Sequence, residues 1–327
     1  MKKFSVIVLC LILALSAMFA GCAKEEKSQT LKFGFGIDIS APVANAATAD
    51  KEGSGKLDIT FAAVTIDKNG KIVSCALDTA SNTVNFTADG KAVAKTEFKT
   101  KYELGKDYGM VAYAGSKKEW FEQADAFEKI VAGKTLAEVK ALIAEEGKGN
   151  KEVVDAGCTI AINEFVGAIE KAYNAAADSK VTANDTIKVT AATEQTCTDA
   201  TADKDGSNKI STTVFAAALD KDGKVVAAIS DCVELSFTFD TKGASTLDTT
   251  KLVLSKKEQG KDYGMVAYGN AKKEWFEQAA AFDAACIGKT ATEIAGLVGE
   301  DGKGVDDLQK AGCTIFVTGF VKAASKI

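Results

Sequence analysis

The hydrophobic and polar positions follow the same order twice along the chain, alternating first as in strands and then spaced as in helices. In the first copy, residues 57–66 are apolar and β-branched, 67–70 read Asp-Lys-Asn-Gly, and 71–77 alternate again. An Asn-Gly pair between two such runs is a strong signal for an antiparallel hairpin. Residues 83–87 and 94–102 have the composition of further strands. This half therefore predicts an antiparallel sheet.

The other half of the pattern has helical spacing. Apolar residues fall on one face of a helix at Trp120, Phe121, Ala124, Phe127 and Val131. A Thr-x-x-Glu capping box beginning at Thr135 predicts the start of another helix, and residues 165–173 predict a last amphipathic one. Strands followed by helices indicate an α+β fold.

The chain is one unit written twice. Residues 105–123 and 260–278 are identical at 16 of 19 positions. The repeated unit is far longer than the 20–50 residues of a solenoid repeat, so it indicates a tandem duplication. We expect repeat 1 at 31–178 and repeat 2 at 185–327, separated by a polar stretch, each with an N-terminal antiparallel sheet followed by helices.

The first residues have the pattern of an export signal. Residues 1–21 contain two early lysines, an apolar run at 4–15 and small residues just before Cys22. This resembles the bacterial lipobox, in which the cysteine is lipid-modified; ordinary signal cleavage is the alternative. The resemblance implies that Cys22 anchors the protein to the lipid bilayer, exposed on the outer face of a bacterial cell membrane. Residues 22–30 are polar and predict a tether.

The composition excludes several kinds of site. The chain has no His and no Arg, and all 40 of its basic residues are Lys. It therefore has no Ser-His-Asp or Cys-His catalysis, no metal site with a His ligand and no guanidinium clamp on a phosphate. The net charge of −5 and the absence of a basic stripe argue against nucleic acid as a partner. We expect no metal site.

Two elements in each copy resemble the FMN-binding domain family of bacterial exported proteins. One is the hairpin at 64–72 and 217–225, and the other is the Gly-Cys-Thr turn at 157–159 and 312–314, which runs into a terminal helix. The resemblance identifies an exported lipoprotein with two tandem, degenerate FMN-binding-domain-like repeats.

In that family FMN lies against the turn, and in many members a transferase esterifies its phosphate to the threonine. Gly lets the backbone approach the phosphate, and a helix N-terminus favours its charge. The resemblance implies a cofactor-binding role for the two turns, which consist of Gly157, Cys158, Thr159, Gly312, Cys313 and Thr314. Thr159 and Thr314 match the esterified threonine.

The aromatic residues of the duplicated segment form a second candidate group. Trp120 and Trp275 are the only tryptophans, and Tyr108 and Tyr263 precede them at matching places. These rings could stack on a flat ligand such as an isoalloxazine. The alternative is that they form the core between helix and sheet.

Six cysteines follow Cys22, and only Cys158 and Cys313 are equivalent between the copies. Disulfides between 197 and 232 and between 286 and 313 are one alternative; six reduced, buried thiols are the other. From all these features we expect a membrane-anchored extracellular lipoprotein that binds FMN or carries electrons, rather than an enzyme. The alternative function is a cofactor-free surface interaction or structural lipoprotein.

Overall fold

The computed structural model describes residues 29–327. The expected signal peptide (1–21), Cys22 and all but the last two residues of the expected tether lie outside the described residues. Within residues 29–327, none of the helices is both long and apolar enough to cross a membrane.

Repeat 1 begins with an antiparallel sheet in the order β5-β4-β3-β1-β6, in which β2 also pairs with β3. The strands are β1 (Thr30–Ile39), β2 (Val43–Asn45), β3 (Gly53–Ile66), β4 (Ile72–Phe86), β5 (Ala92–Val93) and β6 (Ala177–Thr182). The expected hairpin between β3 and β4 is confirmed. Its turn is held by Asp67 Oδ1, which accepts the N–H groups of Asn69 and Lys71 at 2.8 Å each.

The sheet of repeat 2 is antiparallel too, in the order β7-β8-β9. Its strands are β7 (Thr186–Thr198), β8 (Gly206–Leu219) and β9 (Val225–Phe239). Strands β3 and β8 have the same length and the same burial pattern, with their last eight residues all buried. Because both faces of these strands are covered, they read in the sequence as continuous apolar runs.

Helices follow each sheet, which confirms the α+β fold of two tandem copies. Repeat 1 has α2 (Lys101–Leu104), η1 (Gly105–Tyr108), α3 (Met110–Ala114), α4 (Trp120–Val131), α5 (Leu136–Lys140), η2 (Glu145–Gly147), α6 (Lys151–Ala156) and α7 (Asn163–Ala175). Repeat 2 has α8 (Lys256–Gln259), η3 (Gly260–Tyr263), α9 (Trp275–Cys286), α10 (Ala291–Ala295), α11 (Asp306–Lys310) and α12 (Thr318–Ala324).

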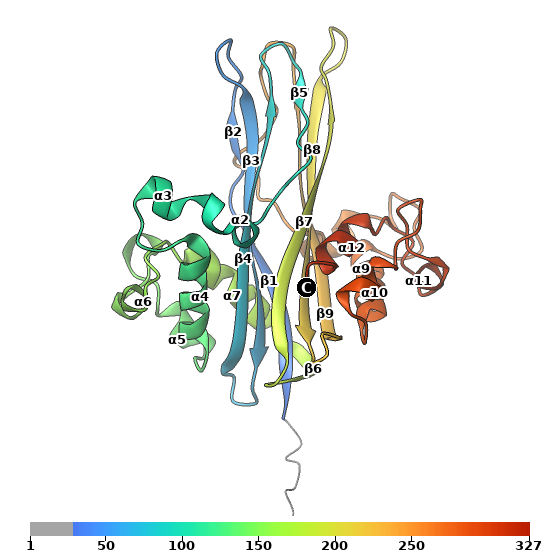
Figure 1. Cartoon of the computed structure of the whole chain (residues 1–327). Helices are drawn as coiled ribbons and strands as arrows, with labels where there is room; N and C mark the ends of the chain where they lie inside the picture. The colour runs from blue at the N-terminus through green and yellow to red at the C-terminus, as the bar shows by residue number, and fades with distance from the viewer. Residues whose placement is uncertain (1–28) are drawn as a thin grey trace, which may run out of the picture.

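The two sheets face each other along the centre of the molecule, and each repeat covers its outer face with its own helices (Figure 1). The layer between the sheets is apolar and contains residues of both repeats. Within it Phe86 of β4 stacks on Phe239 of β9, with ring centroids 4.6 Å apart. Asn82 of β4 crosses this layer as well, donating to the hydroxyls of Thr193 and Thr212 at 3.1 and 2.8 Å. The two repeats therefore share one core and have a second core each.

Two of the expected strands need correction. Residues 94–102 are not a strand: helix α2 begins within them, because Thr100 and Glu103 form a capping box. The expected strand at 83–87 is the end of β4, which continues unbroken from the hairpin. The polar stretch expected to separate the repeats forms β6, which pairs with β1.

Candidate functional site

Each repeat has a cavity between its helices and the outer face of its sheet. We call them the Trp120 cavity, of about 510 Å³, and the Trp275 cavity, of about 660 Å³. Both volumes lie in the range of small-molecule sites. The two cavities are lined by matching parts of the duplicated segments, so they are two copies of one candidate site.

A lysine ammonium lies between two aromatic rings in each cavity. Lys101 Nζ is 5.1 Å from the ring centroid of Tyr108 and 5.4 Å from that of Trp120. In repeat 2, Lys256 Nζ lies 4.9 Å from Tyr263 and 5.4 Å from Trp275. Such distances allow cation–π attraction. The capping boxes that begin α2 and α8 place each lysine at the first helical position.

The two tryptophans form the inner walls of the cavities. Trp120 is only 3% exposed and Trp275 4%. Tyr102 and Phe165 both pack edge-to-face on Trp120, with ring centroids 5.7 Å away. The tryptophans therefore belong to the core and also border the cavity, whereas Tyr108 is 37% exposed and open to a ligand.

A buried glutamate holds each cavity in shape. Glu119 accepts the backbone N–H groups of Met110 and Val111 at 2.9 and 3.3 Å, and it caps α4. Glu274 does the same for Met265 and Val266 at 3.0 and 3.3 Å. These bonds join the Gly-Met-Val segment to the Glu-Trp-Phe segment, and both segments are identical in the two copies.

A glutamine from the same helix positions each predicted threonine. Gln123 Oε1 accepts both the N–H and the hydroxyl of Thr159, at 2.8 and 3.0 Å. Gln278 makes the same two bonds to Thr314, at 2.8 and 3.0 Å. Both threonines are exposed. Thr314 lines the Trp275 cavity together with Tyr263 and Trp275, whereas the structure brings Thr159 beside the Trp120 cavity, which its neighbour Ile160 lines.

The predicted glycines shape the turn at the ends of α6 and α11. Gly157 and Gly312 have φ of 99° and 102°, conformations that L side chains rarely adopt. A Cβ at either position would lie 2.2 Å from the Nζ of Lys118 or Lys273. Each turn therefore has a lysine ammonium directly beside it. Neither glycine lines the cavity.

Cys158 and Cys313 are core residues, fully buried, and neither lines a cavity. Burial raises the pKa of both thiols to about 11, so they stay protonated at neutral pH. All six cysteines of residues 29–327 are free thiols, so the disulfide alternative is not formed in this structure.

Sequence reasoning missed the polar residues that organise the site. Lys101, Lys118 and Gln123 contact the predicted aromatics, glycine and threonine, and the same holds for their copies. These polar residues follow no hydrophobic or aromatic pattern in the sequence. The one signal that could have found them is that they occur at the same spacing in both copies.

The duplicated segments, residues 105–123 and 260–278, also contain exposed apolar side chains. Val111 and Val266 are 45% and 46% exposed, and Tyr113 and Tyr268 are 89% and 88% exposed. A need for core packing does not explain why these residues are the same in both copies. Tyr113 lines the Trp120 cavity.

Comparison with known proteins gives one partial match. Over 106 residues the chain is 36% identical to a chlorophenol reductase of Desulfitobacterium hafniense, covering 28% of this chain and 32% of that protein. The chain therefore spans about a third of the length of this relative. No family model and no solved structure matches the chain.

Proposed function

We propose that the protein is a lipid-anchored extracellular protein whose repeats each bind FMN, and that it carries electrons rather than acting as an enzyme. One observation carries this proposal. The same cavity recurs in both repeats, with a lysine between tyrosine and tryptophan and with an exposed threonine hydroxyl at or beside it.

The residues present fit the two halves of FMN. Tyr108 and Trp120 offer an aromatic wall to a flat ring system. For the phosphate, the ammonium of Lys118 lies at the Gly157 turn, and Thr159 presents its hydroxyl two residues further on. Lysine, hydroxyl and backbone N–H groups are the phosphate ligands open to a chain without arginine.

A bound flavin would supply electron transfer, while the chain would bind, orient and shield it. The partial match supports a redox role, because that relative is named for a reduction. For the anchor, β1 begins at Thr30, eight residues after Cys22. A lipid on Cys22 would hold this end of the sheets close to a membrane.

The test is to purify full-length protein from a host that has a flavin transferase, and to measure visible absorbance and in-gel fluorescence. We expect yellow protein whose fluorescence survives denaturation and is lost in the Thr159→Ala, Thr314→Ala double variant. Thr246→Ala is the matched control, because Thr246 is exposed and follows Gly-Ala-Ser but lines neither cavity. Serine at 159 and 314 should restore the signal, since it keeps the hydroxyl.

Fluorescence that leaves the protein on denaturation would limit the proposal to non-covalent binding. Colourless protein that takes up no added FMN would contradict it. The exposed Val111, Tyr113, Val266 and Tyr268 then favour the second candidate function, a cofactor-free surface interaction.

A further inference from the structure

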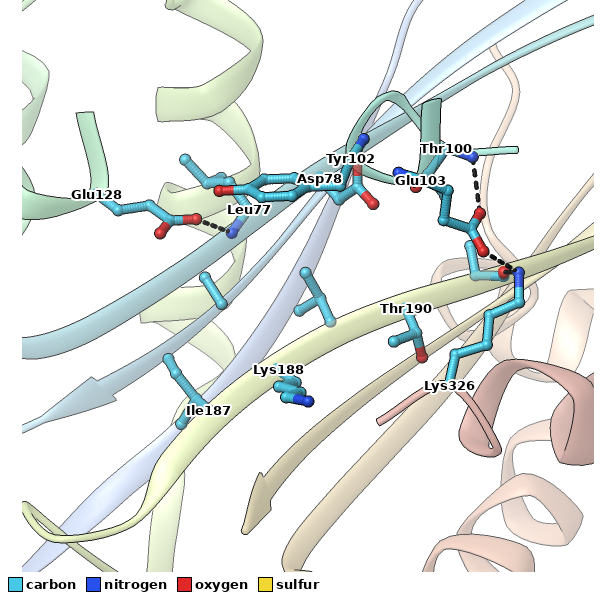
Figure 2. A pocket seen from close by; sticks show the side chains of 13 residues that line it. Leu77, Asp78, Thr100, Tyr102, Glu103, Glu128, Ile187, Lys188, Thr190 and Lys326 are labelled. Carbon is cyan, nitrogen blue, oxygen red and sulfur yellow. Dashed lines mark hydrogen bonds and ion pairs between the residues drawn. The ribbon is translucent and has the colours of Figure 1, made fainter. Parts of the chain in front are cut away.

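A separate cleft of about 460 Å³ lies between the two repeats (Figure 2). Repeat 1 contributes residues of β4, α2 and α4, and repeat 2 contributes β7 and Lys326. Its walls are largely apolar, with Leu77 on one side and Ile187 and Val189 on the other. We call it the Glu128 cleft, after the carboxylate that lines it.

Glu128 accepts few hydrogen bonds for a carboxylate in a largely buried position. Its Oε1 accepts the backbone N–H of Leu77 at 2.7 Å, and Figure 2 shows this bond at one end of the cleft. Among the ion pairs of residues 29–327, none includes Glu128. Two lysines line the cleft, Lys188 and Lys326, and Lys326 pairs with Glu103 at 2.6 Å toward the other end of the cleft.

The surroundings of Glu128 make its charge less favourable on balance. Burial, together with the nearby Asp125 and Asp78, raises its pKa to about 8, although the N–H of Leu77 and the charge of Lys129 act in the opposite direction. The hydroxyl of Tyr102 donates to Asp125 and not to Glu128. Within residues 29–327, no lysine lies at ion-pair distance from this carboxylate, although Lys188 lines the same cleft.

The matching cleft of about 620 Å³ on the other side of the sheets shows what such a carboxylate needs. There, Lys257 stands in place of Tyr102 and lines the cleft. Its Nζ lies 3.5 Å from Asp283, the counterpart of Glu128, which Ser230 also contacts through its N–H at 3.1 Å and its hydroxyl at 2.5 Å. We call this the Lys257 cleft.

The rims of the two clefts are alike. Lys171 pairs with Glu258 at 2.6 Å across the Lys257 cleft, and Lys326 pairs with Glu103 at 2.6 Å across the Glu128 cleft. The copies therefore differ at the wall. In repeat 2 the chain provides an ammonium to the carboxylate, and in repeat 1 a tyrosine stands at that position and donates its hydroxyl to Asp125 instead.

We propose that the Glu128 cleft binds a small molecule that carries an aliphatic primary ammonium group. The ammonium donates to Glu128, as Lys257 does to Asp283, and the alkyl chain lies along Leu77, Ile187 and Val189. Lys257 in repeat 2 thus makes the contact that the proposed ligand would make in repeat 1. The lining of this cleft shares no residue with the Trp120 and Trp275 cavities, although Tyr102 packs on Trp120.

The probe is n-butylammonium, which is a lysine side chain without its backbone, titrated into full-length protein by calorimetry at pH 8.5. A primary amine stays protonated there. We expect one saturable site, with the Leu77 amide shifting in NMR spectra. Glu128→Gln should weaken binding about tenfold or more, because a charge-assisted hydrogen bond is lost. Tyr102→Lys should abolish binding, because the new ammonium would pair with Glu128 as Lys257 pairs with Asp283.

Two further variants separate this site from general effects. Asp283→Asn should leave probe binding unchanged, whereas Lys257→Ala should open the second cleft and raise the stoichiometry from one to two. Absence of saturable binding to wild-type protein would overturn the proposal, whatever the variants do. So would binding by Glu128→Gln equal to that of the wild type. Neither result would bear on FMN uptake, which absorbance measures separately.

Discussion

The two clefts between the repeats occupy matching places, yet they accommodate a carboxylate in different ways. Beside the Lys257 cleft, which Asp283 itself does not line, that carboxylate is contacted by an ammonium, a hydroxyl and a backbone N–H, all from its own repeat. In the Glu128 cleft, a backbone N–H is the donor. Since the rim ion pairs have the same length, the difference arises from a few wall residues and not from how the sheets pack.

The aromatic cavities differ from the clefts in this respect. Their lysine-to-ring distances agree between copies within a few tenths of an ångström, and their glutamine–threonine bonds have the same lengths. After the duplication, the aromatic and glutamine contacts of the cavities stayed alike, although within residues 29–327 only Lys256, and not Lys101, forms an ion pair, with Glu234 at 3.0 Å. The cavities therefore suit a function common to both repeats, and the Glu128 cleft suits one that only repeat 1 has.

The equivalence of the two cavities is tested by removing the buried glutamate that shapes each of them, which should have the largest effect on stability. We expect Glu119→Ala and Glu274→Ala each to lower the free energy of unfolding by about 3 kcal/mol, because each leaves buried N–H groups unpaired and removes a helix cap. Urea unfolding of each variant measures this. Losses that differ between the two by more than about 1 kcal/mol would contradict the equivalence of the cavities.

The divergence of the clefts is tested by removing the residue that distinguishes them. Lys257→Ala should cost about 2 kcal/mol, since it leaves buried Asp283 without its cation, although the partial exposure of Lys257 reduces the loss. The counterpart Tyr102→Phe should cost less than about 1 kcal/mol, because Asp125 is only half-buried. Equal losses of unfolding free energy for the two variants would contradict the divergence of the two clefts.

The sequence predicted those parts of the fold that depend on short-range rules. The hairpin at Asp67–Gly70 and the capping box at Thr135 each follow from a local pattern, and both form as expected. The segment at 94–102 has strand-like composition, but the capping box at Thr100 starts a helix inside it. The face-to-face packing of the sheets could not be predicted, because it depends on residues of both repeats that lie far apart in the sequence.

The sequence predicted the aromatic residues and threonines of the candidate site, but not the polar residues that hold them in position. The duplication marked Tyr108, Trp120 and Thr159 with their copies. The role of Gln123 as acceptor for Thr159 requires a turn from α6 to lie against α4, which is a tertiary arrangement. The Glu128 cleft was missed altogether, because it is built by both repeats and its meaning appears only when Tyr102 is compared with Lys257.

The smallest of these expected effects on stability is also the most specific, because its size depends on pH. Burial raises the pKa of Glu128 from an ordinary value of 4.5 to about 8. The folded protein therefore keeps a proton that the unfolded chain has already lost, and stability should fall as the pH rises from about 4.5 to about 8. Asp78, whose pKa burial raises to about 7, contributes to the same slope.

Glu128→Gln should remove part of this slope, because glutamine is neutral throughout. Urea unfolding should show the variant equal to the wild type near pH 4 and about 1 kcal/mol more stable at pH 8.5, less than the full shift implies since Glu128 is partly open to the cleft. Burial raises the pKa of Asp283 as well, against the opposing charge of Lys257, so Asp283→Asn should remove a further part of the same slope. A Glu128→Gln variant that keeps the wild-type slope would contradict the role given to this buried carboxyl in the pH dependence.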